Sequence, residues 1–153
     1  EQAAELSEQD VIVVPTKTIP QGMSALLAYN PDASLEDNQK NMSEACNYVK
    51  TGQITYAVRD TQIDGLTIEK DNFMGIIDGS IKATDPDKVT ATKKLIADLV
   101  DEDDEILTIL QGEDSTDEEV EELVTYIEEQ YPELEVETHQ GNQPIYSFIF
   151  SVE

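Results

Sequence analysis

The sequence predicts an α/β (α+β) domain, a mixed β-sheet with flanking helices and an antiparallel β-meander inserted into it. Apolar, β-branched runs alternate with segments of helical spacing in residues 1–52 and again in residues 85–153. Between them, residues 53–84 hold short β-rich pieces separated by Asp-Gly or Asp-Asn pairs, which are typical of hairpins. We interpret residues 1–153 as a single domain with a β-loop-α start (residues 1–52), a β-meander (53–84) and an acidic αβαββ half (85–153).

The first 52 residues begin with "EQAAELSEQD", which resembles the last turns of a helix without an N-cap and so suggests a fragment of a longer chain. Residues 11–14 are all apolar and β-branched, which predicts a strand covered on both faces. Thr18 stands three residues before Gln21, the spacing of a capping box, and predicts that a helix begins there. A second helix is predicted from Ser34 to Gly52, with Cys46 on its buried side.

The later elements follow from similar local signals. Asp64-Gly65 and Asp78-Gly79 predict type I′ turns, and Asp71-Asn72 marks a third break. Helical spacing predicts helices over residues 85–100 and 115–132, the second with a capping box between Thr116 and Glu119. Strands are predicted at residues 105–110, 134–139 and 144–153, the last of them apolar and aromatic enough to be central in the sheet.

The charge is strongly negative and unevenly placed. Nine Lys and Arg stand against 34 Asp and Glu, a net charge of −25, and no cation follows Lys94. Such a field repels nucleic acid phosphates and anionic lipid headgroups, which excludes nucleic acid as a partner. Two interpretations of the acidity remain, general solubility or electrostatic attraction of a basic protein.

Composition also bounds the compartment and the chemistry. No apolar run approaches the roughly 18 residues that span a bilayer, so we expect no integral membrane segment. One cysteine cannot form an internal disulfide, so we expect a cytoplasmic protein. The single histidine, His139, lies in a polar segment that we predict to be a hairpin, away from any nucleophile. The acidic clusters at 101–105 and 112–119 lack the order of a calcium-binding loop. We therefore predict neither catalytic nor metal-binding residues.

One loop has the chemistry of an anion site. In "PTKTIPQG", the hydroxyls of Thr16 and Thr18, the ammonium of Lys17 and the free N–H groups of a helix start are suited to a carboxylate or phosphate. Capping alone also explains Thr18 and Gln21. The loop is therefore either a ligand or partner site or a structural turn.

Four stretches carry a family resemblance: "VIVVPTKTIPQGMSALLAYNP", "YAVRDT", "FMGIIDG" and "YSFIFSVE". Over nearly the whole chain, the sequence resembles the C-terminal region of the bacterial fatty acid kinase ATP-binding subunit, the dihydroxyacetone-kinase-like (DhaL) FakA family. The resemblance implies an N-terminal kinase domain and a middle domain outside this chain, and a fold that is in part like that of DegV proteins.

The resemblance also implies a function. In this family the kinase subunit phosphorylates the carboxyl group of a fatty acid held by a separate DegV-like carrier, and the C-terminal region is expected to dock that carrier. By this implication the fragment is not an enzyme and needs no cofactor, whereas ATP and magnesium belong to the kinase domain. Its expected partners are the carrier and the other domains of its own chain, which is expected to be dimeric. The exposed side of the last helix is the expected partner-binding face: Glu118, Glu121, Glu122 and Glu129.

Two alternatives remain open beside carrier docking. The chain is suited to binding a small anionic acyl or phosphate group through Thr16, Lys17, Thr18 and Gln21, or to serving as a solubility or dimerisation domain. The sequence does not decide between these three.

Overall fold

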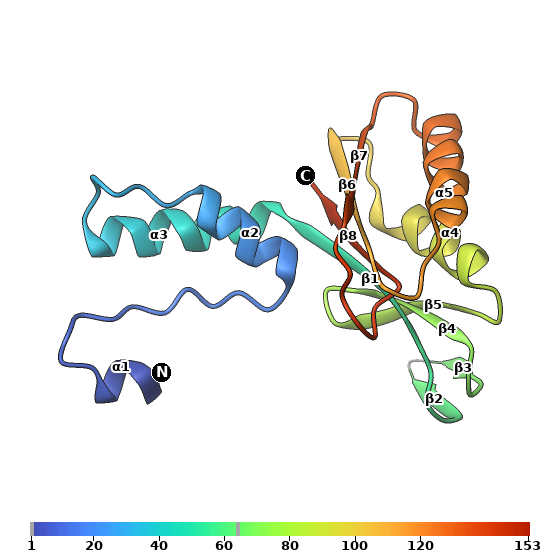
Figure 1. The fold of residues 1–153 in the computed structure, drawn as a ribbon, viewed down its shortest axis with the longest axis horizontal. Coiled ribbons are helices and arrows are strands. Elements are labelled where there is room, and N and C mark those ends of the chain that lie inside the picture. The colour runs from blue at the N-terminus through green and yellow to red at the C-terminus, as the bar shows by residue number, and fades with distance from the viewer. Residues whose placement is uncertain (1, 64) are drawn as a thin grey trace. The chain divides into compact units, whose positions relative to one another are not determined.

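A six-stranded mixed sheet forms the centre of residues 50–153, in the strand order β5-β4-β1-β8-β6-β7 (Figure 1). The computed structural model describes residues 2–63 and 65–153, and it confirms the predicted α/β class. The chain divides into two compact units, residues 1–49 and residues 50–153, which we describe in turn.

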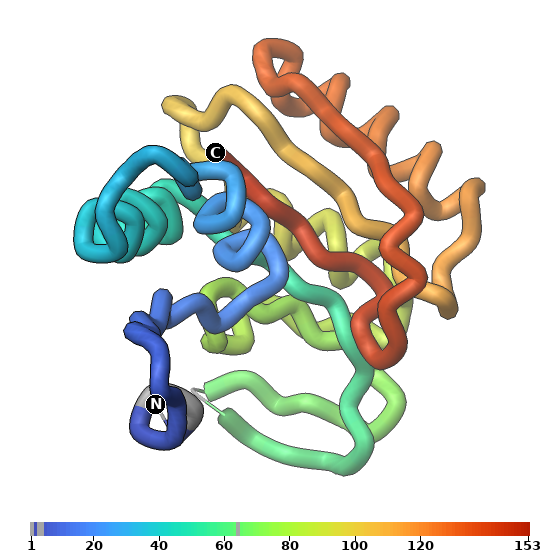
Figure 2. Tube along the Cα trace, turned by 60° about the vertical axis from the view of Figure 1, so that its left-hand side comes forward, coloured from blue at the N-terminus to red at the C-terminus, as the bar shows by residue number. Residues whose placement is uncertain are grey.

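The C-terminal strand is central in the sheet, as predicted. It lies between β1 and β6 and is antiparallel to both (Figure 2), and β6 and β7 form the parallel pair. A hairpin of β2 and β3 stands apart as a second, two-stranded sheet between β1 and β4 along the chain. The strands are β1 (Lys50–Tyr56), β2 (Thr61–Ile63), β3 (Leu66–Ile68), β4 (Phe73–Ile77), β5 (Ser80–Asp85), β6 (Ile106–Gln111), β7 (Glu135–Gln140) and β8 (Phe148–Val152).

Two helices cover this sheet. Helix α4 (Lys88–Leu99) packs on β1, β4 and β5, and α5 (Asp117–Gln130) packs beside α4 and on β7. Gly52 and Gly75 let α4 approach, since a Cβ on Gly52 would lie 2.7 Å from Leu99 Cδ2. The buried core consists of Ile54, Leu95, Ile96, Leu99, Leu107, Ile109, Val120, Leu123, Ile127, Leu134, Phe148, Phe150 and Val152.

The turn between β4 and β5 has the predicted type I′ backbone. Asp78 and Gly79 have φ angles of 46° and 86°, the positive values that such a turn requires at both central positions. The other predicted Asp-Gly turn includes Asp64, which lies outside the described residues. Its Gly65 has a φ of 84°.

The N-terminal unit is helical and contains α1 (Gln2–Leu6), α2 (Ile19–Leu27), α3 (Leu35–Ala45) and the 3₁₀ turn η1 (Cys46–Tyr48). The strand predicted at residues 11–14, and with it the β-loop-α start, is wrong. A strand needs the backbone of a neighbouring strand to bond with. Here a side chain takes that place, since Gln39 Nε2 donates to Val13 O at 3.3 Å. Val11 and Val13 are exposed.

The end of the second helix also differs from the prediction. Helix α3 ends at Ala45, and Gly52 lies within β1, where it pairs with Ile77 and Phe150. Strand pairing across more than 90 residues of sequence therefore overrides the helical spacing that continued through Val49. Cys46 follows the helix, half-buried, and its Sγ donates to Met42 O at 3.1 Å.

The start of α4 gives a pH-dependent prediction. Asp87 accepts hydrogen bonds from Thr90 Oγ1 and Thr90 N, at 2.7 and 2.8 Å, and these bonds hold the pKa of Asp87 below its ordinary value of 3.8. We expect Asp87→Ala to lower the free energy of unfolding by about 1 kcal/mol near neutral pH, and Asp87→Asn, which keeps a cap, to lower it less. Urea denaturation of both variants measures these differences.

The direction of this pH dependence follows from the lowered pKa of Asp87. The charged cap stabilises the fold above the unfolded-state pKa, and its contribution is lost as the pH falls through the folded-state pKa. The deficit of Asp87→Ala should therefore shrink as the pH falls below 3.8 and through the lowered folded-state pKa of Asp87. An equal deficit near neutral pH and in acid would contradict the charged cap.

Candidate functional site

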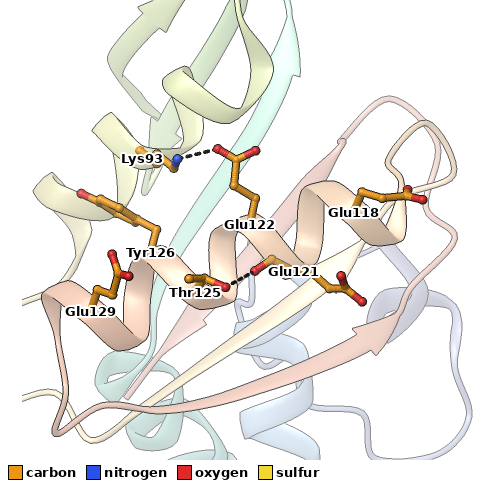
Figure 3. Close-up of a pocket in the computed structure, with 7 residues that line it drawn as sticks. All are labelled: Lys93, Glu118, Glu121, Glu122, Thr125, Tyr126 and Glu129. Carbon is orange, nitrogen blue, oxygen red and sulfur yellow. Dashed lines mark hydrogen bonds and ion pairs between the residues drawn. The ribbon is translucent and has the colours of Figure 1, made fainter.

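The exposed side of α5 brings together all four predicted acidic residues (Figure 3). Glu118, Glu121, Glu122 and Glu129 line one open pocket of about 380 Å³. Lys93 from α4 and Tyr126 and Thr125 from α5 complete its lining. The structure thus places the predicted partner-binding residues on one surface, which we call the α5 acidic face.

Local sequence explains why this side of α5 faces water. The helix begins at a capping box, in which Thr116 Oγ1 accepts from Glu119 N at 3.2 Å and Glu119 Oε2 accepts from Thr116 N at 2.9 Å. Its buried stripe of Val120, Leu123 and Ile127 packs into the core. Helical spacing then leaves the glutamates on the opposite side.

One of the four glutamates is already paired. Lys93 Nζ lies 2.7 Å from Glu122 Oε1 and 5.4 Å from the centre of the Tyr126 ring. Within residues 2–63 and 65–153, Glu118, Glu121 and Glu129 form no ion pair. The face therefore holds three uncompensated carboxylates, and Glu122 differs from the others in stabilising the contact between α4 and α5.

The loop before α2 has one of the two bonds of the predicted capping box, and the Gln21 side chain bonds the residue before the cap instead. Thr18 Oγ1 accepts from Gln21 N at 3.3 Å, and Gln21 Oε1 accepts from Lys17 N at 2.9 Å. Thr16 N donates to Val14 O at 2.9 Å. These bonds account for Thr18 and Gln21 without a ligand.

A second pocket adjoins this loop. It has a volume of about 240 Å³ and is lined by Pro15, Lys17, Gln21, Ser43, Cys46 and Asn47. The Lys17 side chain is exposed and forms no ion pair in the described part of the chain. Ligand binding by Thr16 and Lys17 stays a prediction.

The structure places His139 in the predicted strand at residues 134–139 and not in a hairpin, and it adds a polar network. His139 lies in the edge strand β7, which continues in parallel register beside β6 up to Gln140. Its Nε2 is 3.6 Å from Glu137 Oε2. Asp117 Oδ1 accepts from Gln111 Nε2 at 3.1 Å and from Gln140 Nε2 at 3.3 Å. Sequence reasoning missed this network, whose one local signal is a glutamine at the end of each parallel strand.

The described residues contain no group of three or more His, Cys, Asp or Glu side chains arranged to hold a metal ion. No helix in the part of the chain that the structure covers is long and apolar enough to cross a membrane.

Comparison with known families identifies the chain. The family model for the C-terminal part of FakA-like fatty acid kinase subunits matches residues 1–153. The chain belongs to this family. Protein YloV of Bacillus subtilis (strain 168) is 52% identical over 152 residues, which cover 99% of this chain and 28% of YloV. A Staphylococcus aureus (strain USA300) protein is 48% identical over 153 residues, again 28% of its length. This FakA-like chain therefore spans 28% of the length of these relatives.

Solved structures show the same fold. A DegV family protein from Corynebacterium glutamicum superposes with a TM-score of 0.63 at 16% identity, over 99% of this chain and 67% of that one. The Streptococcus pneumoniae Fatty Acid Kinase (Fak) B3 protein loaded with linoleic acid gives a TM-score of 0.52 at 11% identity, over 79% and 50% of the two chains. This FakA-like chain thus has a DegV-like fold, as the resemblance implied.

Proposed function

We propose that this chain is a non-catalytic docking domain of a fatty acid kinase. It binds a DegV-like fatty-acid-binding carrier, so that a kinase domain elsewhere in the full-length chain phosphorylates the carboxyl group of the bound fatty acid. ATP and magnesium act in that kinase domain, in the cytoplasm, and the full-length chain is a dimer. The observation that carries the proposal is the α5 acidic face, whose glutamates gather on one surface of a family member.

Two side chains are best suited to nucleophilic or acid–base catalysis, Cys46 and His139. Their surroundings support the proposal that the domain is not catalytic. The Cys46 thiol donates to Met42 O within its own helix turn. His139 is exposed on the outer strand β7, with Glu137 as its neighbour. Acyl or phosphoryl transfer through either would need a base or nucleophile within hydrogen-bond reach, and these contacts do not supply one.

Electrostatics explains how such a face would serve docking. Three uncompensated carboxylates on one helix, in a chain of net charge −25, attract a basic surface over several Å of water and raise the rate of association. Exposed pairs of this kind contribute little to the lifetime of a complex. The α5 acidic face should therefore act chiefly on the association rate constant.

Charge reversal tests this proposal. We expect Glu121→Lys to slow association with the fatty-acid-loaded carrier by about three- to tenfold at low salt. The matched control is Glu69→Lys, an exposed acid on the segment after β3 that changes the net charge equally. Glu121 is a cleaner choice than Glu122, because reversing Glu122 would also break its ion pair with Lys93.

Surface plasmon resonance across a salt series provides the measurement. The deficit of Glu121→Lys should shrink as salt rises, because the Debye length falls to about 8 Å at physiological ionic strength. Association that is insensitive to salt, or equally slow in Glu69→Lys, would remove the α5 acidic face from the mechanism. A wild-type chain that does not bind the carrier would overturn the docking function itself.

A further inference from the structure

Helix α2 turns its large apolar side chains to water and its small side chains inward. Ile19, Met23, Leu26 and Leu27 are 51, 47, 71 and 87% exposed, whereas the buried residues of the helix are Pro20 and Ala25. At about 100° per residue, the four large side chains fall within about 100° of arc. We call these four residues the α2 apolar face.

The contacts of α2 within its unit fix this orientation. Ser24 Oγ donates to Ala45 O at 3.2 Å, and the Cys46 Sγ lies 3.6 Å from Gln21 O. The side of α2 that carries Gln21 and Ser24 therefore lies against the end of α3. The α2 apolar face points away from α3, because Gln21 and Ser24 lie roughly opposite it on the helical wheel.

This arrangement is the reverse of the one that the hydrophobic effect gives to a surface helix. An amphipathic helix buries its apolar stripe and presents polar residues to water. A contiguous apolar surface rimmed by polar residues is typical of a protein interaction site. The exposure of the α2 apolar face therefore indicates that a partner covers it.

Charge indicates what that occupant is. Residues 1–49 hold eight acidic residues and two lysines, and Lys40 lies 4.0 Å from Glu44. Asp32, Glu36 and Asp37 are exposed just beyond the C-terminal end of α2. A second copy docked here would bring the same acidic residues against this surface, which like-charge repulsion disfavours wherever else the full-length dimer is joined. An apolar groove with a basic rim is complementary to this surface.

We propose that the α2 apolar face docks into an apolar, basic-rimmed groove of the DegV-like carrier, an inference that rests on the proposed function and names its contact surface. Helix-in-groove recognition uses anchors at i, i+4 and i+7, the spacing of Ile19, Met23 and Leu26. Buried apolar anchors set the lifetime of a complex, whereas exposed charges act on its formation. The α2 apolar face therefore sets the dissociation rate constant, and the α5 acidic face sets the association rate constant.

The test uses Leu26→Asp in the 153-residue chain, with Val58→Asp as the matched control. Val58 is 74% exposed and lies in the segment after β1, so the same change is made at an equally exposed apolar residue outside α2. We expect Leu26→Asp to raise the dissociation rate constant for the loaded carrier at least about tenfold. We expect its association rate constant, and both constants for Val58→Asp, to change less than about twofold. Leu26→Ala, which favours the helix, should give an intermediate increase.

The outcomes separate this inference from the proposed function. If the wild-type chain does not bind the carrier, both fall. If it binds and Leu26→Asp dissociates at the wild-type rate, only the contact surface proposed here falls. A large fall in the melting temperature of Leu26→Asp alone would show that the chain itself covers the face. Wild-type dimers that Leu26→Asp dissociates in sedimentation would show that a second copy covers it. Either result would overturn the inference.

Discussion

Alanine in place of Gly112 is expected to lower the free energy of unfolding by about 3 kcal/mol, near the upper end for overpacking. A Cβ at this position would collide with Tyr146 O and would lie 2.9 Å from Ser147 O and 3.1 Å from Gln143 O. All three are backbone atoms, which cannot move aside as the end of a flexible side chain can. Gly112 N also donates to Ser147 O at 2.8 Å, so relief of the collision would break the link between the ends of β6 and β8.

Gly22→Ala is the matched control. A Cβ on Gly22 would have nothing within 4 Å, and alanine favours a helix over glycine by about 0.5–1 kcal/mol. Urea denaturation followed by circular dichroism should therefore show opposite signs for the two glycine-to-alanine changes. A Gly112→Ala variant as stable as the wild type would contradict the close backbone packing of residues 143–147 against the end of β6.

Elements specified by neighbouring residues could be predicted from the sequence. The capping box at Thr116 and the turn at Asp78-Gly79 depend on bonds and φ angles within a few residues, and both have the expected geometry. The segment at residues 11–14 and the end of α3 could not be predicted in this way. Residues 11–14 would form a strand only beside a partner strand, and Gly52 lies in β1 because it pairs with Phe150 of β8. Both outcomes depend on residues distant in sequence.

The same distinction applies to the candidate site. Helical spacing alone placed the four glutamates on one face of α5, and the structure brings them to one pocket. The pairing of Glu122 with Lys93 was not predictable, because the two residues lie 29 positions apart on different helices. The orientation of α2 was likewise not predictable, because the contacts of Ser24 and Gln21 with the end of α3 decide which side faces water.

The two surfaces differ in what holds them in place. In the unit that holds the α2 apolar face, few of the apolar side chains that the structure describes are buried, among them Ala25 and Val49. The α5 acidic face rests on the large core of residues 50–153, through Val120, Leu123 and Ile127. A change in that core should therefore alter α5 through stability, whereas a change on its surface should alter binding alone.

Leu123→Ala separates these effects. Leu123 is fully buried beneath the α5 acidic face, and its truncation is expected to lower the free energy of unfolding by about 3 kcal/mol through lost apolar burial and a cavity. Leu123→Met, which nearly conserves volume, should cost less than about 1.5 kcal/mol. Glu121→Lys, by contrast, should leave stability within about 0.5 kcal/mol of the wild type while it slows carrier association. Combined urea denaturation and binding kinetics on the three variants measure both quantities. Equal losses of stability in Leu123→Ala and Glu121→Lys would show that the glutamates of α5 support the fold, and would contradict their assignment to docking.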